Sequence, residues 1–273
     1  MYKSTLLLVP TVLIAAGAGT ARAQQDIPTT QPSHLTIYIE EVKVGMDAAH
    51  AANEAGWPAA FAKAGAPETY LALASMTGDS EVWFTAPYES YTHEGAAMTR
   101  NEADPVLSAE LARLWANDGQ FLESARTIQA LARPDLSHGD FPDLAMARFW
   151  DISTFRVRSG HDAQFEEAAK LYGEIAAREG ADLSFRVYAV TAGAPGGTYL
   201  IFSSVNEYGD FDQGMAAGNA LFEGMSDDER EVFEKFGLEA QQFTVTNRYR
   251  LDPGMSYVDE ATEAADLAFW GGN

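Results

Sequence analysis

The sequence predicts an α+β protein built from two tandem βαββαβ repeats. Residues 42–48 (Val-Lys-Val-Gly-Met-Asp-Ala) return 115 positions later as residues 157–163 (Val-Arg-Ser-Gly-His-Asp-Ala). In each copy a helix-like stretch, a glycine and two strand-like segments then follow in the same order. The second of these strand-like segments ends at residues 88–91 in one copy and at residues 205–208 in the other. An internal repeat of this length indicates the architecture before any single element is assigned.

The elements of the second copy follow from its residue pattern. Aromatic and β-branched residues enrich its strand-like segments, while Asp162 can cap a helix that stops at Gly180. The Ala-Gly-Ala-Pro-Gly-Gly turn at 192–197 joins the two middle strands as a hairpin. A capping box, Ser226-Asp227-Asp228-Glu229, begins the last helical part. The expected strands are 148–157, 183–191, 198–204 and 243–251, and the expected helical regions are 162–178 and 210–236.

The first copy has the same order of elements. Pro58 is expected to kink or split its first helix, because proline lacks the amide hydrogen and clashes with the preceding turn. Residues 124–131 fit a strand or the continuation of a helix, and the similarity of residues 133–138 to residues 251–257 favours the strand. The expected strands are 35–44, 69–76, 81–85 and 124–131, and the expected helical regions are 48–63 and parts of 91–117.

A βαββαβ unit forms a four-stranded antiparallel sheet with both helices on one face, the ferredoxin-like arrangement. The other face needs cover, and two tandem copies can cover each other. This element order, with Glu89-Ser90-Tyr91 and Asn206-Glu207-Tyr208 before each second helical region, resembles the dimeric α/β-barrel superfamily. That superfamily includes antibiotic-biosynthesis-type monooxygenases and NIPSNAP-like proteins. The resemblance spans residues 35–257 and implies that the two repeats pack as an intrachain dimeric α/β barrel.

The repeats also suggest how the chain divides. We expect a first ferredoxin-like repeat at 34–137, a linker at 138–145, a second repeat at 146–257 and a C-terminal helical tail at 258–273. Because each copy covers the open face of the other, we expect a monomer in solution.

Residues 1–23 have the layout of a secretory signal peptide. Lys3 precedes an apolar run at 6–18, and Ala21-Arg22-Ala23 precedes Gln24. The run is too short for a membrane span, which needs roughly 20 apolar residues. We therefore expect cleavage after Ala23 and a periplasmic or secreted protein. Residues 24–33 offer little to bury and are expected to form a disordered leader.

The chain is strongly acidic, with 40 Asp and Glu against 18 Lys and Arg and a net charge of −22. Removal of residues 1–23 takes away two basic residues and leaves a net charge of −24. Such a chain repels phosphate backbones and anionic headgroups, so nucleic acid and membrane surfaces are not expected partners. The absence of cysteine excludes disulfides, thiolate catalysis, zinc–thiolate sites and iron–sulfur clusters.

Alternation along the strands predicts which side chains face the barrel interior. These are expected to be Arg186, Tyr188, Trp150, Arg156 and Glu41. They could form a ligand pocket with an aromatic wall and an arginine that holds a carboxylate or enolate. Alternatively, Arg186 pairs with Glu41 or another acid and seals the interface between the copies, and the abundance of acids favours this ion pair. Tyr188 and Trp150 are then interface aromatics.

The histidines do not predict a metal site. None of the five has a spacing that places two on one element facing an ion, so neither a metal nor a cofactor is expected. Haem-binding members of the superfamily need a proximal histidine, and nothing in the sequence singles one out. His93, at the start of a helical segment, is the candidate general base. His50 aligns with Phe165 of the second copy, which places it on the helix face toward the core.

Three functions fit these observations. The first is an exported barrel that binds a small apolar or amphipathic molecule in its interior. The second is a cofactor-independent monooxygenase or isomerase, in which His93, Arg186 and Tyr188 serve a substrate that forms its own carbanion. The third is a structural pseudo-dimer with a filled interior. A cavity of about 300 Å³ or more lined by Arg186 and Tyr188 would favour the first two over the third.

Overall fold

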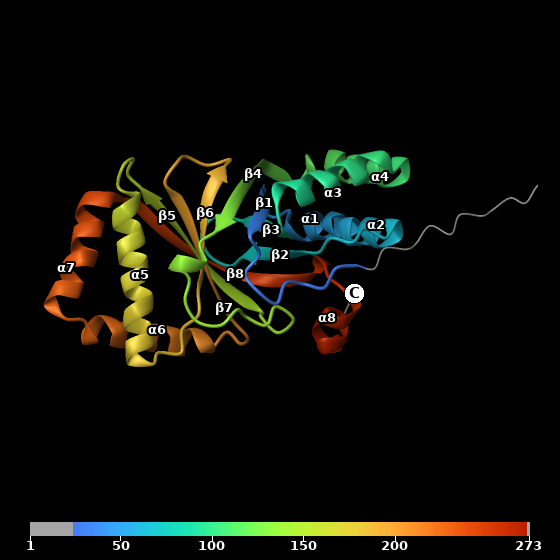
Figure 1. The fold of residues 1–273 in the computed structure, drawn as a ribbon. Coiled ribbons are helices and arrows are strands. Elements are labelled where there is room, and N and C mark those ends of the chain that lie inside the picture. Colours follow the sequence, from blue (N-terminus) through green and yellow to red (C-terminus); the bar gives the residue numbers. More distant parts are fainter. Residues whose placement is uncertain (1–23, 272–273) are drawn as a thin grey trace, which may run out of the picture.

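The computed structural model describes residues 24–271, and the expected signal peptide lies outside them. Within this range the chain forms two βαββαβ repeats whose eight strands close into one barrel (Figure 1). The first repeat contains β1 (His34–Val42), α1 (Asp47–Glu54), α2 (Gly56–Ala64), β2 (Tyr70–Ser75), β3 (Glu81–Tyr88), α3 (Tyr91–Ala103), α4 (Pro105–Asp118) and β4 (Leu122–Ala132). The second contains β5 (Phe149–Val157), α5 (Asp162–Glu179), β6 (Arg186–Ala192), β7 (Thr198–Val205), α6 (Asp210–Gly224), α7 (Asp227–Lys235), the π-helical turn η2 (Phe236–Ala240) and β8 (Gln241–Tyr257).

Local sequence explains where the helices begin and end. The Pro58 ring has no amide to donate, and the first helical region is split into α1 and α2 around Ala55. Gly65 and Gly180 end α2 and α5 in the left-handed conformation, with φ of 62° and 61°. Asp162 does not cap α5 as expected. It is the first residue of the helix, and its carboxylate accepts a hydrogen bond from the Tyr199 hydroxyl at 3.0 Å.

The two sheets meet at their edges as well as through their faces. The first has the strand order β4-β1-β3-β2 and the second β8-β5-β7-β6. Antiparallel pairing of β2 with β8 (Leu73 opposite Leu251) and of β4 with β6 (Leu131 opposite Ala189) closes the ring. Residues 124–131 therefore belong to a strand, β4, that pairs with both repeats. The predicted intrachain α/β barrel is confirmed, and its closure leaves no sheet edge among these strands open.

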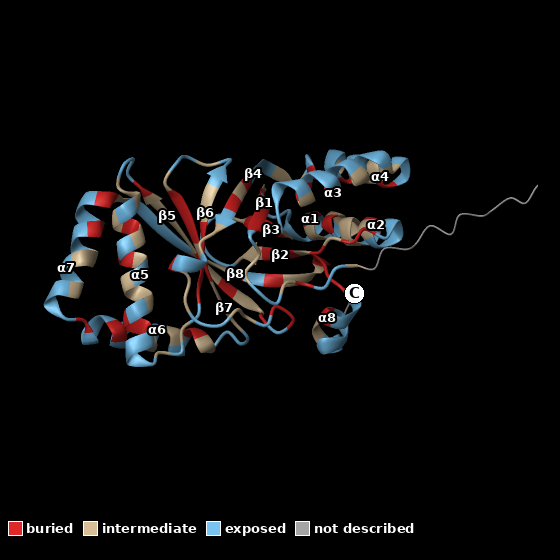
Figure 2. Ribbon diagram, in the orientation of Figure 1, coloured by how far each residue is buried: buried red, intermediate tan, exposed pale blue. Residues whose placement is uncertain are grey.

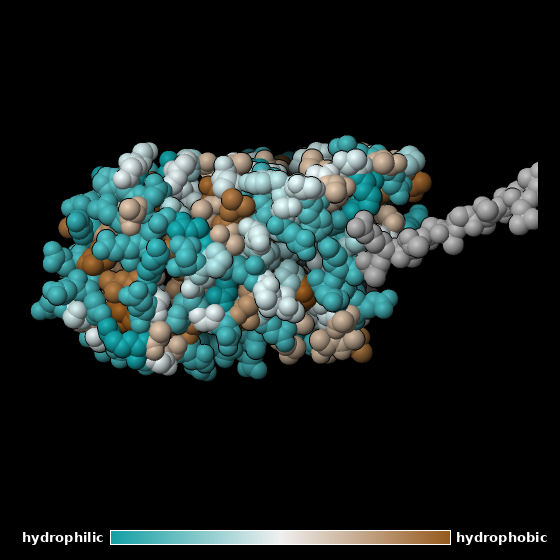
Figure 3. Space-filling view, in the orientation of Figure 1, coloured by the Kyte–Doolittle hydropathy of each residue, from teal (hydrophilic) through white to brown (hydrophobic). Residues whose placement is uncertain are grey.

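The barrel interior is packed with apolar side chains from alternate positions of the strands. These side chains form one hydrophobic cluster, the barrel cluster, which includes the fully buried residues Ile37, Ile39, Leu73, Ile152, Leu200, Tyr249 and Leu251. Buried residues follow the strands and the inner faces of the helices, whereas the outer helix faces are exposed (Figure 2). Hydrophilic residues dominate the face shown in Figure 3, as the acidic composition requires.

The helices of each repeat cover the outer face of its own sheet, so that two helical layers flank the barrel (Figure 1). In the second repeat an aromatic cluster fills the space between sheet and helices. Phe165 of α5 stacks on Tyr199 of β7 with ring centroids 4.1 Å apart, and Phe236 lies 5.8 Å from Phe165. The corresponding space in the first repeat is not filled in this way, and it holds the largest pocket described below.

Residues 24–33 contradict the expected disordered leader. They contain neither helix nor strand, yet Ile27 is buried in the barrel cluster. The amide of Ile27 donates to Asp259 Oδ2 at 2.8 Å, and the Gln31 side chain donates to the Val187 carbonyl at 3.0 Å. The segment is fixed by one buried apolar side chain and by hydrogen bonds to other parts of the body, which its polar composition alone did not reveal.

The C-terminal tail packs on the same body. It contains α8 (Glu260–Ala265) and α9 (Leu267–Trp270). Trp270 is buried, and its indole donates to the Ala145 carbonyl in the linker at 3.0 Å. None of the helices in residues 24–271 has both the length and the apolar character needed to cross a bilayer.

Candidate functional site: a pocket beneath the helices of the first repeat

A pocket of about 570 Å³ lies between the outer sheet face and the helices of the first repeat. Strand residues form its floor and residues of α2, α3 and α4 form its roof. The lining residues include Tyr38, Glu40, Tyr70, Phe84 and Tyr88 on the strands, and Trp57, Phe61, Ala97, Met98 and Trp115 on the helices. This volume is within the range that encloses small organic ligands.

The pocket has an exposed rim and a buried end. Tyr38, Met98 and Trp115 are between 44% and 55% exposed, which places them at the opening. Glu40 and Glu54, by contrast, are only 5% and 3% exposed. Aromatic walls that lead from solvent to buried carboxylates suit a molecule with an apolar body and a polar end.

The buried end contains a carboxylate–histidine pair. Glu40 of β1 and His50 of α1 are both buried, and Glu40 Oε2 lies 2.8 Å from His50 Nε2. Glu54 follows His50 by four residues, so the two side chains lie on the same face of α1. One oxygen of each of these carboxylates and one His50 ring nitrogen lie within 4.8 Å of one another.

Asp118, at the end of α4, extends this group of side chains. The carboxyl group is fully buried, and its Oδ1 accepts a hydrogen bond from Asn53 at 2.7 Å. Burial, together with the nearby charges of Glu40 and Asp118, raises the pKa of Glu54 to about 10. We call Glu40, His50, Glu54 and Asp118 the Glu40 cluster.

The second repeat shows what the same positions hold when they serve packing alone. With the 115-residue offset, Glu40 corresponds to Phe155, His50 to Phe165 and Glu54 to Ala169. Strand pairing supports the alignment. Glu40 of β1 lies opposite Val82, the second residue of β3, and Phe155 of β5 lies opposite Tyr199, the second residue of β7. The rings of Phe155 and Phe165 are 5.5 Å apart in the aromatic cluster. The fold therefore accepts an apolar core where the first repeat buries ionisable groups.

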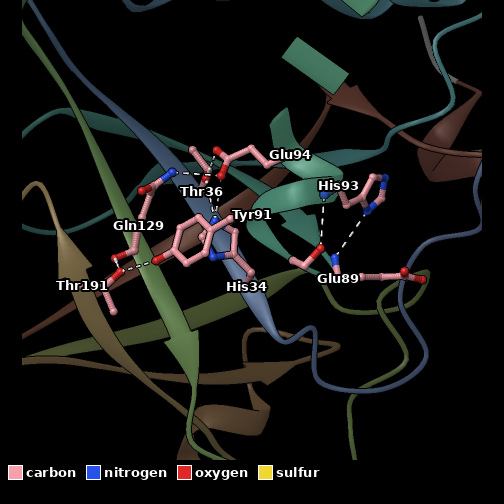
Figure 4. Close-up of polar contacts among 9 residues, drawn as sticks. His34, Thr36, Glu89, Tyr91, His93, Glu94, Gln129 and Thr191 are labelled. Atoms are coloured by element: carbon pink, nitrogen blue, oxygen red, sulfur yellow. Dashed lines mark hydrogen bonds and ion pairs between the residues drawn. The ribbon is translucent and has the colours of Figure 1, made fainter. Parts of the chain in front are cut away.

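A second carboxylate–histidine pair lies where α3 meets β1. His34 Nε2 is 3.0 Å from Glu94 Oε2, which also accepts from the Gln129 amide at 2.9 Å, and Glu94 Oε1 accepts from the Thr36 hydroxyl. Figure 4 shows these side chains converging. Because three neighbours satisfy Glu94, this network reads as a buried connection between α3 and the strands β1 and β4.

His93, the sequence candidate for a general base, lies outside both groups. Its ring points away from the His34–Glu94 pair (Figure 4), and its Nδ1 accepts a long hydrogen bond from the Glu89 amide at 3.4 Å. Its own amide donates to Ser90 Oγ, the N-cap of α3. The next residue in the chain, Glu94, is the one whose side chain is buried between α3 and the strands.

Three of the predicted interior residues line a smaller cavity at one mouth of the barrel. The cavity has a volume of about 310 Å³, and Arg186, Tyr188 and Trp150 contribute to its wall. Residues of the leader and of the linker cover it, among them Ile27 and Phe141. This volume reaches the roughly 300 Å³ expected of a cavity that binds a small ligand.

The expected ion pair of Arg186 with an acid is wrong. The guanidinium instead donates to the carbonyls of His138 at 2.8 Å, Phe185 at 3.0 Å and Gly139 at 2.7 Å. Glu41 cannot reach it, because Glu41 lies at the end of β1 remote from the mouth and accepts from Ser124. Arg186 therefore fixes the start of the linker rather than sealing the interface between the copies through an ion pair.

Arg156 also lies away from Arg186. Arg156 lies near one end of β5 and Trp150 near the other. The Nε atom of Arg156 is buried and has no hydrogen-bond partner among the described residues. The five residues predicted as one site are thus divided between the two ends of the barrel, with Arg186, Tyr188 and Trp150 at one end and Arg156 and Glu41 at the other.

The Glu40 cluster was missed although the sequence carried a signal for it. His50 and Glu54 have i, i+4 spacing on a helix, but an acid at this spacing from a lone histidine is common on helices and was interpreted as one of several scattered acids. The stronger signal is the comparison of the copies, in which glutamate and histidine replace two phenylalanines at core positions. Buried ionisable groups of this kind are costly to retain, so they mark a candidate site.

The fold has counterparts among solved structures. A "putative monooxygenase" from Fusobacterium nucleatum superposes with a TM-score of 0.53 at 11% identity, over 80% of this chain and 91% of that one. Another "putative monooxygenase", from Lactobacillus acidophilus, gives a TM-score of 0.50 at 7% identity, over 84% and 97% of the two chains. At such identities the likeness shows the fold alone, and it confirms the predicted dimeric α/β barrel. No protein-family model matches the sequence, and no curated protein is significantly similar to it.

Proposed function

We propose that the protein binds a small, flat, amphipathic molecule in the helix-side pocket of the first repeat. The observation that carries this proposal is a pocket of about 570 Å³ with aromatic walls and two buried glutamates, Glu40 and Glu54, at its inner end. Aromatic side chains stack on flat apolar groups, and buried carboxylates accept hydrogen bonds from a hydroxyl or amine. The helix-side pocket is preferred to the barrel mouth because it is larger and holds these ionisable groups.

The divergence of the two repeats supports this choice. Phe155 and Phe165 occupy the positions of Glu40 and His50, so the second repeat buries an apolar core in the corresponding region. A chain selected for stability alone would gain from the same phenylalanines in the first repeat. Ligand binding accounts for a pocket with buried ionisable groups in the first repeat, where packing alone does not.

A second candidate is the cofactor-independent monooxygenase or isomerase. The two solved structures named above are each called "putative monooxygenase". A dry pocket with a buried carboxylate beside an aromatic wall can remove a proton from a phenol or an enolisable carbonyl compound. Consumption of oxygen by the purified protein with a panel of hydroquinones and naphthols, or isomerisation without oxygen uptake, would support this candidate.

Two matched substitutions test which cavity binds the ligand. Ala97→Phe fills the helix-side pocket, and Ser204→Phe fills the cavity at the barrel mouth. Ligands are first found by native mass spectrometry of protein purified from its own host, and affinities are then measured from the fluorescence of Trp57 and Trp115 in the pocket wall. We expect Ala97→Phe to abolish binding and Ser204→Phe to leave it unchanged, with circular dichroism confirming both folds. The reverse result would place the ligand in the barrel mouth and contradict the proposal.

A further inference from the structure

The Glu40 cluster buries three carboxyl groups beside a single basic side chain in ion-pair contact among the described residues. Glu40, Glu54 and Asp118 are each at most 5% exposed. Among residues 24–271 the basic side chain in ion-pair contact with them is His50 alone. Removing three carboxyl groups from water is costly unless protons or a cation compensate for their charge.

The donor atoms are arranged as a cation site. Glu40, His50 and Glu54 each contribute one oxygen or nitrogen, and all three atoms lie within 4.8 Å of one another. Two of these residues lie one turn apart on α1, and the third comes from the adjacent strand β1. An imidazole with two carboxylates is a donor set used for divalent transition metals, and the absence of sulfur ligands favours the harder ions of that series.

Two further polar groups point to a missing partner at this place. Asp118 contacts the Glu54 carboxyl, and its buried Oδ2 receives no hydrogen bond from an amide, hydroxyl or basic side chain in the described part of the chain. The buried Tyr70 hydroxyl is likewise without a partner among residues 24–271, and Tyr70 lines the same pocket as Glu40 and Glu54. Buried polar atoms normally have a partner, so an ion with its bound water would satisfy both.

The other carboxylate–histidine pair also has one buried atom without a partner among the described residues, His34 Nδ1, but its carboxylate is satisfied and stands alone. Glu94 accepts hydrogen bonds from Thr36 and Gln129 in addition to its contact with His34, and no second carboxylate joins them within hydrogen-bond contact in the described structure. With a single carboxylate whose two oxygens both have hydrogen-bond partners, that pair serves as an internal control for the Glu40 cluster.

We propose that Glu40, His50 and Glu54 bind a divalent transition-metal cation such as Mn²⁺, with Asp118 and Tyr70 contacting its bound water. The ion lies at the inner end of the pocket, where it would meet the polar end of the proposed ligand. The inference does not require the organic ligand, because the donor set is complete in the chain. If the ion takes part in turnover, the second candidate activity becomes metal-dependent.

Metal binding to the ligand-free mature protein tests the proposal. Protein treated with EDTA and then dialysed is titrated with Mn²⁺ and separately with Zn²⁺ by calorimetry, and Mn²⁺ binding is followed by the loss of the free-ion EPR signal. We expect one ion per chain and a rise in Tm of about 5 °C at saturating metal. A folded protein that binds neither ion stoichiometrically would overturn the proposal.

Substitutions locate the ion. Glu40→Gln and Glu54→Gln keep the size of the side chain but remove a ligand charge, and each should weaken binding by more than about 100-fold. Glu94→Gln, in the control pair, should leave metal affinity unchanged. Equal losses in Glu40→Gln and Glu94→Gln would overturn the assignment.

A second variant covers the case in which single substitutions unfold the chain. Glu40→Phe with His50→Phe reproduces the aromatic arrangement of the second repeat and should fold without binding metal. Stoichiometric binding by this double variant would also overturn the assignment. Ligand binding is measured separately in EDTA, which distinguishes the two proposals. If the ligand binds but neither ion binds in the metal titrations, the metal site is refuted and the ligand pocket is not.

Discussion

His50 of α1 and Phe165 of α5 occupy equivalent positions in the two repeats, but His50 contacts the Glu40 carboxylate at 2.8 Å while Phe165 stacks on Tyr199 at 4.1 Å. The chain thus contains both an ionisable and an apolar solution for the same place in the fold. The apolar one shows that the architecture does not need the histidine. This relationship makes the second repeat a template for testing the first.

Glu40→Phe combined with His50→Phe should fold at least as stably as the natural chain in metal-free buffer. Replacing a buried polar pair by apolar side chains is often neutral or raises the free energy of unfolding by about 1–4 kcal/mol. His50→Phe alone should instead lower it by about 1–3 kcal/mol, because Glu40 loses its buried partner. Urea denaturation of the wild type, both single variants and the double variant gives the coupling energy. A double variant less stable than either single variant would contradict the expectation.

The fold could be predicted because it depends on patterns that a repeat makes visible. The order of the elements predicted the eight strands. Alternation along the strands predicted that Trp150 and Tyr188 face the barrel interior. Three outcomes depend on contacts between distant segments. The docking of Ile27 on Asp259, the capture of Arg186 by backbone carbonyls and the approach of Asp118 to Glu54 all join residues far apart in sequence. No local pattern encodes such contacts, so the packing of the leader, the partners of Arg186 and the place of Asp118 beside Glu54 could not be predicted from the sequence.

Arg186→Leu should destabilise the protein by about 1–3 kcal/mol through the linker, not through a lost ion pair. The substitution leaves the carbonyls of His138 and Gly139 without their charged donor. Hydrogen exchange should therefore increase in residues 138–145 and stay unchanged in α1. Arg186→Lys, which can replace only part of the hydrogen bonding, should give an intermediate loss. A uniform increase in exchange across both repeats would instead indicate a global role for this arginine.

Closure of the barrel predicts a monomer. The strands of residues 24–271 pair in a complete ring, so no free sheet edge is available for association. Light scattering of the mature protein at low micromolar concentration should give the mass of one chain. An obligate dimer under these conditions would show that a surface outside the sheet edges carries a stable interface.

Export should yield a mature chain that begins at Gln24. In the structure the Gln24 side chain donates to the Val258 carbonyl at 2.9 Å, so the new N-terminus lies against the C-terminal part of the body. The cleavage prediction depends on the small residues Ala21 and Ala23 before this position. Intact-mass measurement of the exported protein checks the site, and retention of residues 1–23 in a membrane fraction would contradict it.

Asp259 should make the attachment of residues 24–33 sensitive to acid. Burial alone would raise the pKa of Asp259, but hydrogen bonds from Thr262 and from the Ile27 amide outweigh it and lower the pKa below its usual range. The stabilisation is therefore complete above the unfolded-state pKa of about 3.9 and is lost as pH falls through the lower folded-state value.

Comparison with Asp259→Asn checks this pH dependence. The variant should have a lower Tm than the wild type at pH 6, by an amount corresponding to about 1–2 kcal/mol, and the difference should shrink below about pH 4. Asp212→Asn, at an exposed position of α6, is the matched control and should show no comparable difference. Proteolysis is a second measurement, because loss of the Asp259 carboxylate frees the Ile27 amide and should expose the leader to cleavage near pH 6. A difference in Tm that grows as the pH falls would contradict the lowered pKa, since the charged carboxylate is the form that accepts these hydrogen bonds.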